Sequence, residues 1–152
     1  MTQLTANFSL EELTRSEAAD RNGWDNTPNA QEIENLKRLA ALLQQVKTAV
    51  GGKPVMINSG FRSKQVNDSV GSKDTSQHRL GCAADIRVPG MKPREVVEAC
   101  IAAGVPFDQI ILEFADEKKG GGWTHISVPN SSEFKPRGSK LIIDRNGTRP
   151  YV

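Results

Sequence analysis

The chain has 152 residues and a mass of 16.6 kDa, which fits one domain, residues 1–152, able to bury its own core without disulfide bonds. A net charge of +2 is too slight for a nucleic-acid-binding surface, so we expect no nucleic-acid partner. No apolar run approaches the roughly 18 residues of a membrane span, and no basic segment followed by an apolar one opens the chain. We therefore expect no stable membrane insertion, and synthesis in the cytoplasm.

The first third of the chain is predicted to be helical. Ser9 and Glu12 form a capping-box pattern, which predicts a short helix over 10–16. After Pro28, apolar residues recur at the spacing of a helix face until Gly51, which ends a long helix.

The remainder of the chain predicts short strands separated by polar turns. In 82–88, alternation places Asp85 on the face opposite Ile86. The charged, glycine-rich segment 116–122 is typical of a mobile loop at the edge of a site. The other predicted elements are a strand over 55–57, helical turns over 64–70, a helix over 93–104, strands over 109–114 and 123–128, and a hairpin of 141–143 with 148–152. Helices before strands indicate an α+β fold with a largely antiparallel sheet flanked by N-terminal and central helices.

Two cysteines, Cys82 and Cys100, are predicted to be buried, reduced thiols. Two cysteines without a secretory leader fit a reducing compartment better than a disulfide framework. We expect a monomer.

The two histidines of the chain, His78 and His125, both stand in segments typical of a metal site. His78 lies at the end of a loop, and Asp85 lies seven positions later with small residues between, so both side chains can reach one ion. His125 shares a strand face with two neighbours in 123–127. Two imidazoles and one carboxylate favour a single zinc ion over magnesium or calcium, with one position left for water. The alternative is that His78 and Asp85 only satisfy each other.

A hydrolytic zinc site needs a carboxylate that takes and returns a proton, and Glu113 is the candidate. It stands in an apolar strand, where an unpaired carboxylate is costly to bury. The alternative is a structural ion pair between Glu113 and Arg62. Asp108 and Asp116 are the fallback candidates.

Four further residues are candidates for substrate binding. Arg62 follows a turn and offers a forked donor to a substrate carboxylate or a developing oxyanion, although it would equally lock its own loop. Ser76 and Gln77, next to the first histidine, offer hydrogen bonds. Trp123 fits a pocket wall as well as it fits the core.

At these residues the chain resembles a known family. The segment from Ser76 to Asp85 reproduces the Ser-x-His-x-x-Gly-x-Ala-x-Asp signature of the zinc D-Ala-D-Ala carboxypeptidases, whose relatives include L-alanyl-D-glutamate endopeptidases of phage lysins and the hedgehog signalling domain. The turn 59–63 and the strand 123–127 resemble two further family motifs. Segments 8–13, 26–28 and 107–114 are similar to the phage and prophage branch.

The resemblance implies zinc on His78, Asp85 and His125, a compact α+β fold, and hydrolysis of murein stem peptides. Many relatives carry an acidic general base three positions before the second histidine, where this chain has Gly122. Glu113, on the neighbouring strand, is the best replacement.

We therefore predict a zinc peptidase of phage-endolysin type that cuts peptidoglycan at a bond involving a D-amino acid. Whether it acts as a carboxypeptidase or an endopeptidase stays open. It would be made without a signal peptide, in the host cytoplasm if phage-encoded, and reach the wall after release. Because of Gly122, the alternative is a non-catalytic, zinc-stabilised module that binds murein or serves as a virion structural protein.

Overall fold

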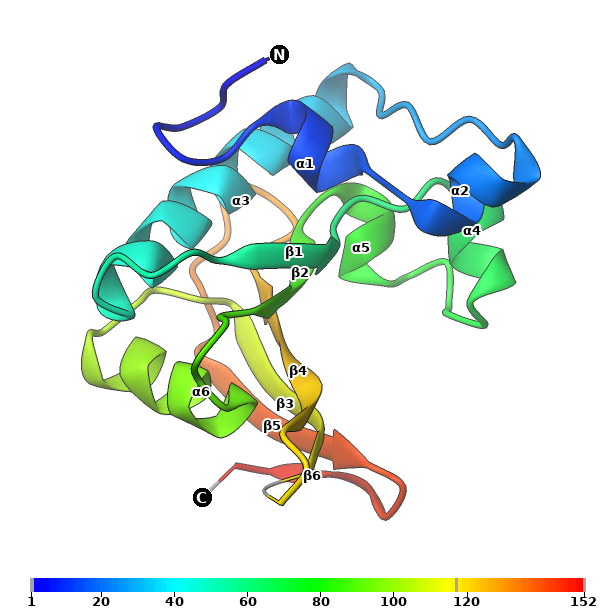
Figure 1. The fold of residues 1–152 in the computed structure, drawn as a ribbon. Coiled ribbons are helices and arrows are strands. Elements are labelled where there is room, and N and C mark those ends of the chain that lie inside the picture. The colour runs from blue at the N-terminus through cyan, green and yellow to red at the C-terminus, as the bar shows by residue number, and fades with distance from the viewer. Residues whose placement is uncertain (1, 117, 152) are drawn as a thin grey trace.

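The computed structural model describes residues 2–116 and 118–151, and within them it shows helices packed around a six-stranded sheet (Figure 1). The helices are α1 (Leu10–Thr14), α2 (Glu17–Asn22), α3 (Ala30–Ala49), α4 (Lys64–Ser69), α5 (Gln77–Leu80) and α6 (Pro93–Ala102). The strands are β1 (Met56–Ser59), β2 (Ala83–Arg87), β3 (Gln109–Asp116), β4 (Gly121–Ser127), β5 (Ser139–Asp144) and β6 (Gly147–Pro150).

The strands lie in the order β1-β2-β4-β3-β5-β6, and every neighbouring pair is antiparallel except β3 and β5. Ser127, at the end of β4, and Ser139, at the start of β5, both pair with Gln109. The chain between β4 and β5 must therefore cross the start of β3. The predicted α+β fold with a mainly antiparallel sheet is confirmed, and the parallel pair is an addition to it.

One face of the sheet carries the core. Ile86 and Ile126 from the central strands are fully buried, as are Leu39 and Val46 from α3. Val97 of α6 joins the same cluster, so α3 and α6 together cover this face. Each such side chain contributes about 1.5–3 kcal/mol when it leaves water. Side chains alternate along a strand, so residues next to these core positions point to the opposite face of the sheet. This second face, hereafter the open face, carries the candidate site.

Local sequence signals explain the helix ends. Ser9 caps α1 in the predicted capping box, accepting from the Glu12 amide while the Glu12 carboxylate accepts from the Ser9 amide. The predicted helix over 10–16 divides, however, because Arg15 is extended and Ser16 caps a second helix, α2. A long helix after Pro28 is confirmed as α3.

Two other segments differ from the sequence prediction. His78 lies on a four-residue helix, α5, that begins after its cap Ser76, rather than at the end of a loop. The segment 116–122, predicted to be a loop, is shortened because β3 continues to Asp116 and β4 begins at Gly121.

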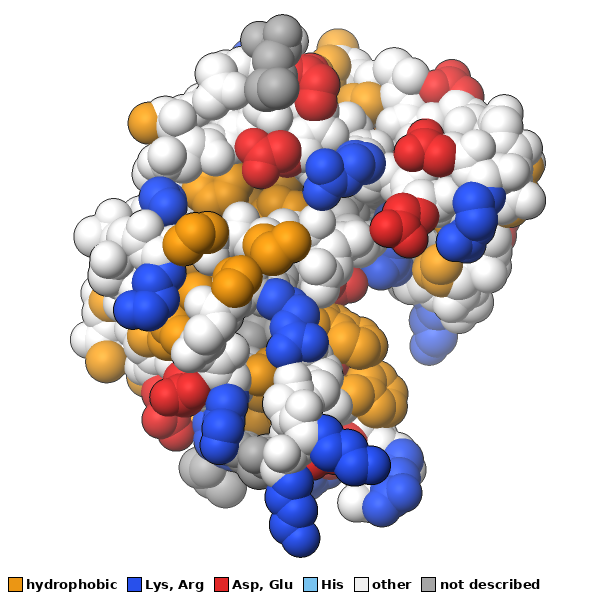
Figure 2. Space-filling model, in the orientation of Figure 1, with side chains coloured by type: hydrophobic (Ala, Val, Ile, Leu, Met, Phe, Trp, Pro, Cys, Tyr) orange, Lys and Arg blue, Asp and Glu red, His pale blue; other side chains and the backbone are white. Residues whose placement is uncertain are grey.

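The open face of the sheet lies in a hollow of the surface. In Figure 2 the molecule is indented between the part that carries α2 and α4 and the part that carries the β5–β6 hairpin. Of the helices described, none is long and apolar enough to cross a lipid bilayer.

Candidate metal centre

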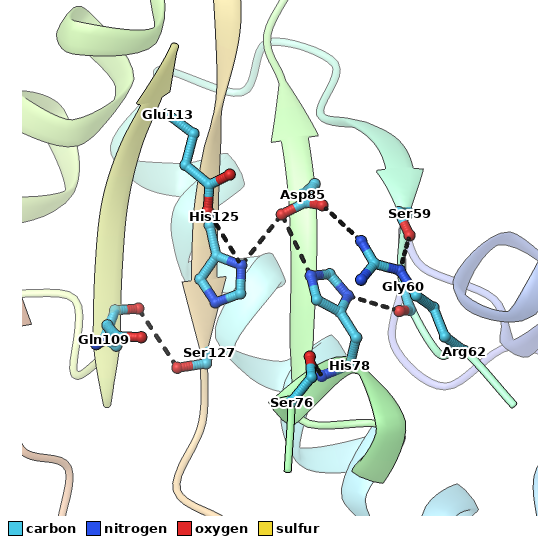
Figure 3. Close-up of polar contacts among 10 residues, drawn as sticks. All are labelled: Ser59, Gly60, Arg62, Ser76, His78, Asp85, Gln109, Glu113, His125 and Ser127. Carbon is cyan, nitrogen blue, oxygen red and sulfur yellow. Dashed lines mark hydrogen bonds and ion pairs between the residues drawn. The ribbon is translucent and has the colours of Figure 1, made fainter. Parts of the chain in front are cut away.

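The open face brings together the predicted ligands from three elements: His78 from α5, Asp85 from β2 and His125 from β4 (Figure 3). Asp85 and His125 are direct partners in the β2–β4 register. One oxygen of Asp85, Oδ1, lies 3.3 Å from His78 Nε2 and 3.1 Å from His125 Nδ1. The three ligand atoms all lie within 4.8 Å of one another, and the three residues are buried.

The environment of His78 selects which of its nitrogens faces the centre. Its Nδ1 lies 2.8 Å from the Gly60 carbonyl oxygen, so Nδ1 donates its proton there and Nε2 keeps a free lone pair toward Asp85. Two imidazoles and a carboxylate that converge in this way fit one zinc ion with an open coordination position. Magnesium and calcium prefer oxygen-only shells, so they fit this donor set less well.

Asp85 is held in its ionised, ligating form. Burial alone would raise the pKa of its carboxyl, but the His78 and His125 imidazoles outweigh burial and hold the pKa well below the usual value. The guanidinium of Arg62 adds an ion pair, with 3.3 Å between Arg62 Nη2 and Asp85 Oδ2. The carboxylate therefore has a partner on each oxygen before a metal binds.

Arg62 and Ser76 also hold the α5 segment in place. The Arg62 amide donates to the His78 carbonyl (3.0 Å), and Arg62 Nε donates to Ser59 Oγ (3.1 Å). Ser76 Oγ accepts from the His78 amide (3.2 Å) as the cap of α5. Both residues lie beside the candidate ligands, and their predicted contact with substrate stays a prediction.

Glu113 reaches the centre from β3. Its Oε1 lies 4.0 Å from His125 Nδ1, and the side chain is largely buried. Burial raises the pKa of the Glu113 carboxyl, and the neighbouring Asp85 charge raises it further, against smaller lowering effects of His125 and Arg62. The short ion pair of Arg62 goes to Asp85 rather than to Glu113. A carboxylate with a raised pKa next to a metal ligand suits a group that exchanges protons near neutral pH.

Comparison with known proteins agrees with this geometry. The family model for peptidase M15 matches residues 6–127. The chain belongs to the peptidase M15 family. It is also 33% identical, over 82 residues, to the zinc D-Ala-D-Ala carboxypeptidase of Streptomyces albus G. That alignment covers 53% of the chain and 31% of the relative, so the chain spans about a third of the relative's length. The membership confirms the family resemblance, and it supports the predicted enzyme class and single zinc ion.

The backbone around position 122 leaves no room for a side chain. Gly122 has a φ of +87°, and a Cβ there would lie 2.4 Å from the Glu113 carbonyl oxygen and 2.6 Å from the Ala115 nitrogen. The crowding comes from an irregularity in β3 between Glu113 and Asp116, where Phe114 has a φ of +50°. In this backbone a side chain at 122 would meet main-chain atoms, and the carboxylate beside the three candidate ligands is that of Glu113.

The two fallback carboxylates have other partners. Asp108 accepts from the backbone amide, Nε and Nη2 of Arg137 and from Gln77 Nε2. Asp116 Oδ1 accepts from the amides of Lys118 and Lys119 at the β3–β4 turn. The geometry therefore favours Glu113 over both.

Gln77 and Trp123 are only partly free to meet a substrate. Gln77 Nε2 lies within hydrogen-bonding distance of Asp108 Oδ2, the Val128 carbonyl and Asn130 Oδ1. Trp123 lies opposite Glu113 in the β3–β4 register, with its ring 5.6 Å from that of Phe114. Their predicted substrate contacts stay predictions.

A cavity of about 650 Å³ opens beside His125. The start of α5 and the start of β3 line two sides, and the segment Pro129–Arg137, hereafter the crossover wall, lines the third. Sequence reasoning missed this wall. Nothing in its composition signals a site, and it lies at the cavity only because β5 pairs with β3.

Proposed function

We propose that this protein is a zinc peptidase that hydrolyses peptidoglycan stem peptides at a bond involving a D-amino acid. The observation that carries the proposal is the convergence of His78, Asp85 and His125 with a largely buried Glu113, whose Oε1 lies 4.0 Å from His125 Nδ1. A site of structural zinc alone needs no such second carboxylate beside the three ligands.

Glu113 and Arg62 have different roles in the proposed hydrolysis. The chemistry that zinc supplies when bound is Lewis acidity, which activates water and polarises the scissile carbonyl. Glu113 takes a proton from the attacking water and returns it to the leaving amine. Arg62, whose pKa is lowered by burial but supported by Asp85 and Glu113, brings a cation to the substrate carbonyl or carboxylate.

Family membership supports the proposed substrate class. The relative from Streptomyces albus G is by its name a zinc D-Ala-D-Ala carboxypeptidase. The motif segments of 8–13 and 107–114 resemble phage and prophage peptidases and support an endolysin role. In that role the protein collects in the host cytoplasm and meets the wall after a membrane pore releases it.

A non-catalytic binding module is the rival function, and Gly122 was the feature in its favour. The crowding around Gly122 and the position of Glu113 both support the enzyme, since the carboxylate is moved to β3 rather than missing.

The test is digestion of Gram-negative murein sacculi by purified protein, with and without a chelator and zinc add-back. Released fragments are identified by mass spectrometry. We expect new amino and carboxyl ends that disappear with the chelator and return with zinc. Intact sacculi, from protein shown to hold one zinc ion, would reject the peptidase and favour the binding module.

A further inference from the structure

The crossover wall lies outside the part of the chain that matches the family. The family model ends at residue 127, and the wall follows it directly. The wall lines the same cavity as His125, so a segment beyond the family match stands beside the candidate metal centre.

A buried carboxylate fixes the wall in place. Asp108 is 3% exposed, and both of its oxygens accept from Arg137, the last residue of the wall. Gln77 links the same carboxylate to Asn130, near the start of the wall, and Gln77 is the residue next to the ligand His78. The start of the wall is thereby tied directly to α5, which carries the ligand His78, and its end is tied to α5 through Asp108.

Two side chains of the wall that line the cavity, Phe134 and Lys135, are available to contact a ligand. Phe134 is 62% exposed, although a phenyl ring is normally buried. Lys135 makes no ion pair with any described residue, whereas Arg137 is neutralised by Asp108. The part of the wall that lines this cavity therefore offers the apolar surface of Phe134 and the positive charge of Lys135, while Glu133 lines a neighbouring pocket.

We propose that the crossover wall is a substrate-binding surface, and that it binds residues of the stem peptide beyond the one next to the scissile bond. The inference rests on the proposed function. Stem peptides carry both aliphatic side chains and several carboxylates, which match Phe134 and Lys135. A cavity of about 650 Å³ holds more than a single terminal alanine. The wall therefore selects for longer peptides.

The test measures binding by calorimetry in zinc-loaded Glu113→Gln protein, so that cleavage does not interfere. The probes are the free pentapeptide stem and the dipeptide D-Ala-D-Ala. The double variant Phe134→Ala/Lys135→Gln removes both contacts. We expect it to weaken pentapeptide binding about tenfold, because one buried aromatic contact is of this size, and to leave the dipeptide within about twofold.

The matched control is Val70→Ala/Lys37→Gln, which removes an exposed apolar side chain and a surface lysine that line no part of this cavity. Its affinities should equal those of the parent. Equal loss of both peptides, or loss of neither, in the wall variant would overturn the proposal. If protein with Glu113 intact cuts no murein while pentapeptide affinity still depends on the wall, the peptidase proposal fails and the wall is a stem-peptide-binding surface without cleavage; if murein is cut but the affinity does not depend on the wall, only the present proposal fails.

Discussion

At the scale of single residues, the site depends on where one carboxylate can be placed. Glu113 and His125 approach from adjacent strands, and the alternation that buries Leu112 in the core turns Glu113 to the open face. Gly122, on the other strand, has no room for a side chain. The position of the acid is thus a consequence of backbone packing as much as of chemistry.

Replacing Glu113 with Gln should lower kcat about 10²–10⁴-fold, the usual contribution of a general base, while the zinc content stays at one ion per chain. The amide has nearly the shape of the carboxylate but cannot accept the proton. Hydrolysis rates and metal analysis of the same preparation check this. The surface variant Glu34→Gln should behave as wild type, and a Glu113→Gln protein with normal turnover would remove Glu113 from the mechanism.

Replacing Gly122 with Ala should lower the free energy of unfolding by about 3 kcal/mol or more, because left-handed strain of about 1–2 kcal/mol adds to overpacking of similar size. Gly120 provides the control, since it also has a positive φ (+70°) but open space around its Cβ position. Gly120→Ala should therefore lower the free energy of unfolding only by the left-handed strain, about 1–2 kcal/mol. Urea unfolding of both variants measures the difference, and equal losses would show that the clash is relieved at no cost.

At the scale of elements, the α5 segment is held in place mainly by its neighbours. It has only four residues, too few to be stable alone, and its cap, its contacts with the 59–62 turn and the Gln77–Asp108 link hold it. Asp108 thereby connects α5, β3 and the crossover wall.

Asp108→Asn should destabilise the protein by about 1–2 kcal/mol at pH 7, a charged hydrogen-bond value reduced because Arg137 is largely exposed. Burial raises the pKa of the Asp108 carboxyl, but hydrogen bonds from Arg137 and Gln77 outweigh it and lower the pKa overall. The stabilisation is therefore full above the unfolded pKa of about 3.9 and disappears as pH falls below it.

Urea unfolding of wild type and Asp108→Asn at pH 7 and pH 3 tests this dependence. The difference between the two proteins should shrink at pH 3. The surface variant Asp68→Asn should show a small difference at pH 7. If the difference in unfolding free energy between wild type and Asp108→Asn were as large at pH 3 as at pH 7, an ionised Asp108 held by Arg137 would be contradicted.

At the scale of the whole molecule, the two cysteines report on global opening. Cys82 and Cys100 are free and fully buried in the core. Burial raises the pKa of the Cys100 thiol to about 12 and also raises that of Cys82. Both thiols should resist iodoacetamide at pH 8 in the native protein and react only on unfolding, because the thiolate is the reactive form. Mass spectrometry counts the adducts, and rapid native labelling would indicate local opening of the α3–α6 face.

Local sequence patterns predicted much of the secondary structure and the three candidate ligands. The capping box at Ser9, the alternation that turns Asp85 to the open face and the strand of His125 all depend on neighbouring residues, and the structure agrees with each. The four-residue α5 is too short for a helical period to be visible. The crossover wall follows from the parallel pairing of β3 and β5, a contact between distant segments that no local pattern encodes.

The position of Glu113 on β3 leaves the β3–β4 turn free to vary in sequence. An acid three positions before the second histidine would stand at position 122, the second residue of β4 and directly after the β3–β4 turn. Glu113 instead stands three residues before the end of β3, so the side chain that would exchange the proton is further from the turn. The tip of the turn, which holds Lys118 and Lys119, can change length and charge while Glu113 and His125 keep their spacing. Replacing the β3–β4 turn with turns of other length or charge would test whether adhesion to an anionic cell wall can be changed separately from turnover.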